Sequence, residues 1–160
     1  MNPKLLLVDD EPAIVEAIEN SLSDEAYTIY KAGCAAEALD VLEHFPVDIV
    51  ITDQCMPGMS GSDLCSAVHQ RWPSTYRILL TSSPDVSGQQ SSNGDIHQYM
   101  DKPWDALQLR YNINEGLRQQ RILRQCINLQ RTFQQPDQTF LITDRNWVII
   151  LANGAWQQWL

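Results

Sequence analysis

The sequence predicts a doubly wound α/β domain built on a five-stranded parallel sheet and followed by an extended C-terminal helix. Two observations support this prediction. Short apolar runs of strand length alternate with amphipathic stretches of helical spacing through the first hundred residues. The chain has 160 residues, which is enough for one full domain and a remainder. Parallel neighbours need crossover connections, so helices are expected on both faces of the sheet.

The pattern of apolar residues predicts the first two strand–helix units. The run 4–8 predicts a buried strand, and Pro12 then stands in the first turn of a helix with apolar residues at helical spacing. Residues 27–31 predict a second strand. The strong helix formers of 35–42 predict a second helix, which ends before Pro46.

The next elements continue the alternation of strands and helices, but one of the helices is only weakly predicted. Residues 47–52 predict the third strand, and the Pro- and Gly-containing stretch 57–61 predicts a loop before a helix over 64–72. Residues 77–81 predict the fourth strand. The stretch 84–94 is rich in Ser, Gln and Gly, so only a short or mobile helix is expected there.

A fifth strand over 97–100 and a long helix over 105–131 complete the expected domain. Ligands of a doubly wound sheet bind beyond the carboxyl ends of its strands, where strand order reverses. The polar residues that follow strands are therefore the candidates for a site, and all of them fall at one edge of the sheet: Asp9, Asp10, Asp53, Thr81 and Lys102.

The presence of each of these residues can also be explained without a functional site. Asp9 and Asp10 could be a solvated turn or charges at a helix start, Asp53 a turn residue and Lys102 a surface charge. Their coincidence at one edge favours a site. Three converging carboxylates repel one another unless a cation neutralises them, and Mg²⁺ prefers carboxylate and water oxygens.

A phosphoryl-transfer site requires these same residue types. A carboxylate such as Asp53 can attack phosphorus and form an aspartyl phosphate if the charge on the transferred group is neutralised. Mg²⁺ and the Lys102 ammonium group would neutralise it, and the Thr81 hydroxyl would donate to a phosphoryl oxygen.

The set of motifs closely resembles the receiver domain of two-component response regulators, over about residues 3 to 120. The resemblance rests on the acidic pair Asp9-Asp10, the run 53–61, the Leu-Thr-Ser of 80–82 and the Tyr-Met-Asp-Lys-Pro of 99–103. It implies the flavodoxin-like receiver fold. It also implies a phosphorylation-dependent signalling switch rather than an enzyme, so that any enzymatic output would lie in domains further downstream.

The resemblance implies a role for each matching residue. Asp53 would accept the phosphoryl group from a histidine kinase or a phosphotransfer protein. Asp9, Asp10 and Asp53 would hold Mg²⁺ together with the backbone carbonyl of Cys55. Thr81 would move toward the phosphoryl oxygens.

The resemblance also implies a switch and a backbone feature. Tyr99 would change rotamer together with Thr81, and the Lys102–Pro103 peptide would be cis. One departure lies beside the phosphoacceptor, because Gln54 occupies a position where the family commonly has an aliphatic residue.

The C-terminal helix carries an apolar stripe at spacings of three and four, formed by Leu109, Ile113, Leu123 and Ile127. Its first half is expected to pack on the sheet. Its second half is expected to form a two-stranded coil with a second copy of the chain, giving a homodimer. The alternative is a plain amphipathic helix.

Two strand-like runs follow, at 139–144 and 147–153, around an Asp-Arg-Asn turn. They resemble the opening of a PAS sensor domain. We therefore expect a receiver domain over 1–120, an extended helix or linker over 121–136, and an incomplete second domain over 137–160, within a larger signalling protein.

Charge and composition narrow the function classes. Residues 1–105 carry 17 acidic and 5 basic side chains, and 106–160 carry 3 and 6, so direct nucleic-acid binding by the main domain is not expected. No membrane span or signal peptide is visible, so we expect a cytoplasmic protein. Two rival functions are an aspartyl phosphatase, for which Gln54 and Cys55 supply no second carboxylate, and a pseudo-receiver that docks without phosphorylation.

Overall fold

The structure is a computed structural model that describes residues 2–82, 94–133, 141–143 and 149–152. The chain divides into two compact units, Met1–Arg121 and Ile122–Leu160. The first unit contains the predicted sheet and its helices. The expected helix over 84–94 lies almost entirely outside the described residues.

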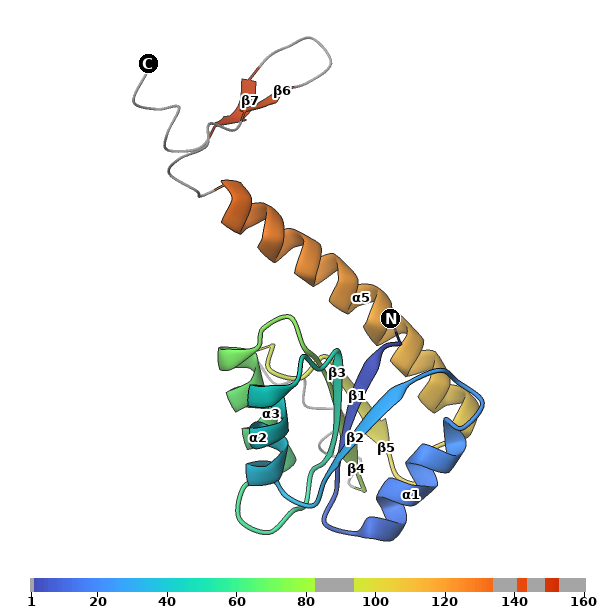
Figure 1. Cartoon of the computed structure of the whole chain (residues 1–160). Helices are drawn as coiled ribbons and strands as arrows, with labels where there is room; N and C mark the ends of the chain where they lie inside the picture. The colour runs from blue at the N-terminus through green and yellow to red at the C-terminus, as the bar shows by residue number, and fades with distance from the viewer. Residues whose placement is uncertain (1, 83–93, 134–140, 144–148, 153–160) are drawn as a thin grey trace. The chain divides into compact units, whose positions relative to one another are not determined.

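The sheet of the first unit has five parallel strands in the order β2-β1-β3-β4-β5. This arrangement confirms the doubly wound class (Figure 1). The strands are β1 Lys4–Val8, β2 Thr28–Ala32, β3 Ile49–Asp53, β4 Tyr76–Thr81 and β5 Gln98–Asp101.

Helices cover both faces of this sheet, as the crossover connections require (Figure 1). Helix α1 and the first part of α5 lie on one face, and α2 and α3 lie on the other. The helices are α1 Pro12–Ser21, α2 Ala35–His44, α3 Gly61–Arg71 and α5 Ala106–Phe133.

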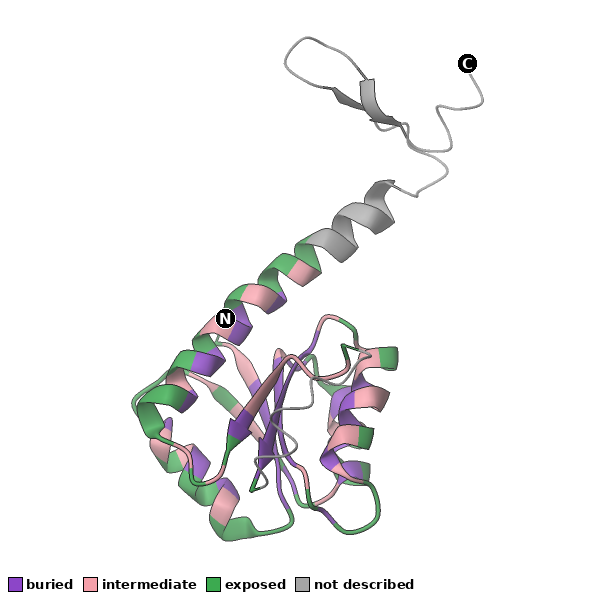
Figure 2. Ribbon diagram, turned by 180° about the vertical axis from the view of Figure 1, so that it is seen from behind, coloured by how far each residue is buried: buried purple, intermediate pink, exposed green. Residues whose placement is uncertain are grey.

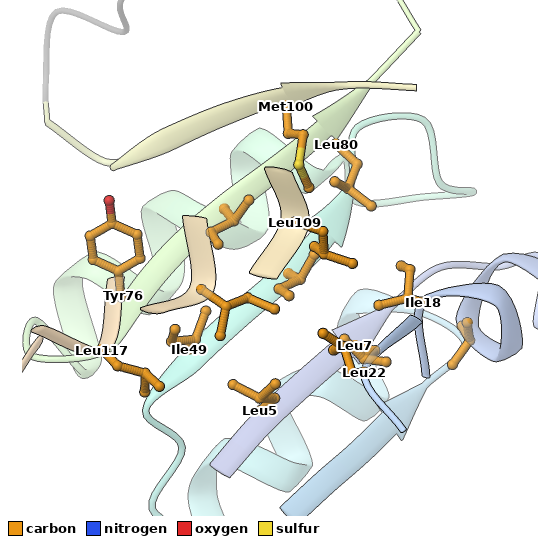
Figure 3. Close-up of a cluster of buried hydrophobic side chains, with 14 residues drawn as sticks. Leu5, Leu7, Ile18, Leu22, Ile49, Tyr76, Leu80, Met100, Leu109 and Leu117 are labelled. Carbon is orange, nitrogen blue, oxygen red and sulfur yellow. The ribbon is translucent and has the colours of Figure 1, made fainter. Parts of the chain in front are cut away.

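The core consists of two apolar layers separated by the sheet. In Figure 2 the buried residues concentrate in the strands and on the helix faces turned toward them. Figure 3 shows the layer under α1 and α5, where Leu109 and Leu117 of α5 meet Ile49 and Leu80 of the sheet. The apolar stripe in the first half of α5 is therefore used within the domain, as predicted.

Glycine is required where α5 crosses the sheet most closely. A Cβ atom at Gly116 would lie 2.6 Å from a ring carbon of Tyr76. A side chain there would separate the helix from the strand, so Gly116 allows the close packing that extends the core to Leu117.

The observed elements shift by one to three residues from the predicted ones, and the largest shift is at α3, which begins at Gly61 instead of residue 64. Strand β3 ends at Asp53 and not at residue 52, because the ladder with β4 includes the pair Asp53–Leu80. The ring of His97 stacks on Tyr76 at a centroid distance of 4.4 Å.

The second unit contains a short antiparallel pair, β6 Leu141–Thr143 and β7 Ile149–Ala152. These strands lie within the two predicted runs. None of the helices in the described part of the chain has the length and apolar character needed to cross a bilayer.

Candidate functional site

The predicted site residues meet at the carboxyl edge of the sheet. Parallel register aligns the strand ends, since Val8 pairs with Thr52 and Asp53 with Leu80. Asp9 directly follows β1, Asp53 ends β3 and Thr81 ends β4. Topology thus brings together residues that are far apart in the sequence.

Three carboxylates form an acidic cluster at this edge. Asp9, Asp10 and Asp53 each offer an oxygen, and these oxygens lie within 4.8 Å of one another. Asp9 and Asp53 are buried, whereas Asp10 is exposed. The cluster therefore has two fixed inner ligands and one outer ligand at the solvent side.

Lys102 joins the two buried carboxylates. Its Nζ atom lies 2.8 Å from Asp9 Oδ2 and 2.8 Å from Asp53 Oδ1. Burial would lower the pKa of Lys102, but its hydrogen bonds to Asp53 and Asp9 outweigh burial and hold the pKa above its usual value. Lys102 is therefore a protonated ammonium group between two carboxylates.

Backbone N–H groups fix the other oxygens of the two buried carboxylates. The Glu11 N–H donates to Asp9 Oδ1 at 2.9 Å, and the Cys55 N–H donates to Asp53 Oδ2 at 2.9 Å. Each carboxylate is thus held at both oxygens, one by the main chain and one by Lys102. Such preorganisation is what a reactive carboxylate requires.

The main chain of α3 approaches the backbone of Asp53 closely. A Cβ atom at Gly61 would lie 2.0 Å from the backbone oxygen of Asp53. Only glycine leaves room for this approach. Gly61 was predicted to lie in a loop, and its packing role was not predicted. The only sign of it in the sequence is the spacing of eight residues after Asp53.

Thr81 and Tyr99 lie on the two neighbouring strands. Thr81 is buried, and its backbone oxygen accepts a hydrogen bond from the Lys102 N–H at 2.7 Å. Tyr99 is half-buried in β5 and pairs in register with Leu79. The Lys102–Pro103 peptide is cis, which confirms the expectation.

This donor set fits a hard divalent cation. Among the described residues the cluster consists of carboxylates, so it offers oxygen ligands. Mg²⁺ binds through one or two carboxylates, waters and phosphate oxygens. The acidic triad is of the type that binds Mg²⁺, and the ammonium group of Lys102 lies beside it.

A doubly wound sheet with an acidic triad and a lysine at its carboxyl edge is typical of a phosphate-accepting signalling domain. The chain belongs to the response regulator receiver domain family, which matches residues 5–114. A receiver domain with this acidic triad and Lys102 is consistent with phosphorylation-dependent signalling, as the motifs predicted.

Individual relatives agree with this membership. The chain is 32% identical to the regulatory protein VanR of Enterococcus faecium over 120 residues, which are 74% of this chain and 51% of VanR. It is 36% identical to the HoxA hydrogenase transcriptional regulator of Cupriavidus necator, covering 62% of this chain and 21% of HoxA. The chain therefore spans about half the length of VanR and less of HoxA.

Solved structures show the same fold. The signal receiver domain of an HD domain-containing protein from Pseudomonas fluorescens has a TM-score of 0.73 and 36% identity, covering 78% of this chain and 93% of that one. The response regulator TrrA from Thermotoga maritima, in complex with Mg²⁺ and BeF, has a TM-score of 0.66 and 30% identity. That match covers 72% of this chain and 99% of TrrA.

Proposed function

We propose that Asp53 is the phosphoacceptor of this receiver domain, that Lys102 neutralises charge on the transferred phosphoryl group, and that the Thr81 hydroxyl donates a hydrogen bond to it. One observation carries the proposal. The ammonium group of Lys102 lies 2.8 Å from a carboxylate oxygen of Asp53, at an edge where three carboxylates converge. An incoming phosphoryl group would find its positive partner already in place.

The transfer is a displacement at phosphorus. A carboxylate oxygen of Asp53 attacks the phosphorus of a phosphohistidine, and the P–N bond breaks. The bonding electrons stay on the imidazole nitrogen, which then takes up a proton. Lys102 would move from pairing two carboxylates to pairing with a phosphoryl oxygen, because the phosphoryl group brings more negative charge than it replaces.

The metal completes this charge balance. Asp9, Asp10 and Asp53 would hold Mg²⁺ together with the backbone carbonyl of Cys55. When bound, Mg²⁺ neutralises charge on the phosphoryl oxygens in the transition state. The TrrA structure supports this assignment, since that relative holds Mg²⁺ and BeF.

The conformational switch would involve two residues beside the site, Thr81 and Tyr99. Thr81 would donate its hydroxyl to a phosphoryl oxygen, and Tyr99, two strand positions before Asp101, would change rotamer in concert. The two residues lie on adjacent strands, so a shift in one changes the space open to the other.

The partner would be a histidine kinase or a phosphotransfer protein, which places the domain in the cytoplasm. The family supports this proposal, because a receiver domain implies a cognate histidine kinase. Direct binding of nucleic acid or of a membrane by the receiver domain is not proposed, in keeping with its acidic charge.

The division into a receiver domain over 1–120, a linker over 121–136 and an incomplete domain over 137–160 remains our proposal for the longer protein. The β6–β7 pair supports a second domain that begins with a hairpin, and we propose the start of a PAS domain there. The second half of α5 would pair two copies of the chain. Sedimentation equilibrium tests this, and Leu123→Glu should lower the measured mass to that of a monomer.

The alternative function is a pseudo-receiver that docks a partner without phosphorylation. Intact mass measurement after incubation with acetyl phosphate, with and without Mg²⁺, separates the two. We expect a gain of one phosphoryl group that needs Mg²⁺, disappears in Asp53→Asn and persists in the control Asp40→Asn, which alters an exposed carboxylate of α2. A folded native protein that gains no mass would favour docking alone.

A further inference from the structure

Gln54 makes three hydrogen bonds to the start of α3. Its backbone oxygen accepts from the Gly61 N–H at 3.1 Å. Its side-chain Oε1 accepts from the Ser62 N–H at 3.2 Å, and its Nε2 donates to Ser62 Oγ at 3.2 Å. The residue after the phosphoacceptor is thus bonded to the first two residues of the next helix.

These bonds satisfy donors that a helix start leaves open. The first N–H groups of a helix have no partner within the helix. In α3, Gln54 satisfies those of Gly61 and Ser62, and Ser60 Oγ satisfies that of Asp63 at 3.2 Å. A side chain from the end of β3 therefore shares the capping of α3 with the N-cap residue.

The same bonds close the base of a six-residue loop, 55–60. One end of this loop begins at Cys55, whose N–H holds Asp53 Oδ2 and whose carbonyl is the proposed metal ligand. The other end is Ser60, which joins the network through a contact of 3.1 Å between its Oγ and that of Ser62. The position of the Cys55 main chain therefore depends on how firmly the loop base is held.

We propose that Gln54 is a positioning residue for the phosphoryl-accepting site. Its amide side chain, bonded twice to Ser62, holds loop 55–60 in the geometry that presents the Cys55 carbonyl to Mg²⁺. The inference rests on the proposed ligation of Mg²⁺ by that carbonyl. It assigns a purpose to a polar residue at a position where an aliphatic side chain could make neither bond.

A purely structural role would have a different signature. Were Gln54 only a cap for α3, its removal would lower stability without changing the affinity of the folded protein for Mg²⁺. A positioning role predicts a change in that affinity, because groups that orient metal ligands commonly alter binding 10- to 100-fold when they are removed.

The test is a calorimetric Mg²⁺ titration of the whole chain and four variants. Gln54→Leu, which removes both side-chain bonds, should raise the dissociation constant about 10-fold. Ser62→Ala, which keeps the Oε1 bond but removes the Nε2–Oγ bond and the contact of Ser62 Oγ with Ser60 Oγ, should raise it about 3-fold. Ser62→Thr keeps a hydroxyl and should restore native affinity. Gln119→Leu alters a hydrogen-bonded glutamine of α5 and should have no effect.

Hydrogen exchange of the metal-free protein gives a second readout. In Gln54→Leu the amides of Gly61 to Asp63 should exchange faster, by about 10-fold at Ser62, whose N–H loses its acceptor. In Ser62→Ala the acceptor Oε1 remains, so exchange at residue 62 should stay near the native rate. If Gln54→Leu does not fold, Ser62→Ala still decides the question through the metal titration.

The outcomes separate this inference from the proposed function. Native Mg²⁺ affinity in both Gln54→Leu and Ser62→Ala overturns the positioning role, even if exchange at α3 rises. A native protein that binds no Mg²⁺ also overturns it. A native protein that binds Mg²⁺ but takes no phosphoryl group contradicts the proposed function alone, and the titrations still decide the role of Gln54.

Discussion

The two ends of β4 both bury a positive charge, but they do so in different ways. At the carboxyl end Lys102 lies between the carboxylates of Asp9 and Asp53. At the amino end the guanidinium group of Arg77 is 1% exposed, and its nitrogens donate to backbone oxygens of Thr75, Gly94 and Asp95.

The two buried cations differ in whether the groups that pair with them can be replaced by other partners. The partners of Lys102 are side chains, which can turn toward a metal ion or a phosphoryl group while the lysine follows the new negative charge. The partners of Arg77 are main-chain carbonyls flanked by the imidazoles of His69 and His97, and these carbonyls cannot leave without unfolding the segment. A buried charge therefore indicates function only where its partners can move.

The largest expected effect is at the amino end. Arg77→Met leaves three backbone oxygens without their donor, so we expect the free energy of unfolding to fall by about 3 to 4 kcal/mol. Urea denaturation measures this loss. The control Arg71→Met alters an exposed pair with Glu43 and should cost less than about 1 kcal/mol. Equal costs in the two variants would remove the distinction between these arginines.

Gly61→Ala tests the close approach at the carboxyl end. The new Cβ would lie 2.0 Å from the Asp53 oxygen, so α3 must shift, at a cost of about 3 kcal/mol in the free energy of unfolding. Gly33→Ala is the matched control, since its Cβ would meet nothing closer than 3.6 Å. A melting temperature of Gly61→Ala equal to that of Gly33→Ala would show that the approach is looser than described.

Lys102→Met tests whether the ammonium group of Lys102 takes part in the phosphoryl transfer. Without the ammonium group the phosphoryl group loses one neutralising partner, so the rate of phosphorylation by acetyl phosphate with Mg²⁺ should fall about 100-fold. The rate is measured by intact mass against time. Lys31→Met, in an exposed pair with Glu19, should keep the native rate. A rate within threefold of native in Lys102→Met would argue against a role in the transfer.

The smallest effect is a pH dependence at the amino end. Burial, with Arg77 nearby, lowers the pKa of His97 to about 4 from an ordinary 6.5. The unfolded chain therefore binds the proton first as pH falls, and stability present above about pH 6.5 is lost toward pH 4. The loss is about 2 kcal/mol after allowance for partial exposure.

His97→Phe keeps a ring against Tyr76 and should flatten the acid side of the stability curve relative to the native protein. The control His44→Gln should not flatten it. A hydrogen bond with the Asp40 carbonyl raises the pKa of the exposed His44, so its protonation favours the folded state instead. Denaturation at several pH values compares the three proteins, and parallel curves for native and His97→Phe would contradict the assignment.

Much of the fold and site could be predicted from local sequence. Apolar runs with intervening helical periodicity predicted five strands in a parallel sheet, because parallel neighbours need crossover connections. The residues after those runs predicted the site, since parallel strands end at one edge. Asp9, Asp53 and Lys102 came together for this topological reason.

Contacts between distant side chains could not be predicted. Arg77 stands between Tyr76 and the apolar run that follows it in β4, and nothing in that pattern shows that its guanidinium group bonds to a main-chain oxygen of Asp95. The hydrogen bonds between Gln54 and Ser62 could not be predicted either, because they depend on how closely α3 approaches the end of β3.

Sequence periodicity therefore established which elements form, their class of sheet and the edge at which the chemistry lies, because these follow from burial and backbone connectivity alone. The folded arrangement established which polar groups are partners. Lys102 pairs with two carboxylates, Arg77 with carbonyls and Gln54 with the start of a helix. Such pairings depend on distances between elements of a few ångströms, which no local pattern encodes.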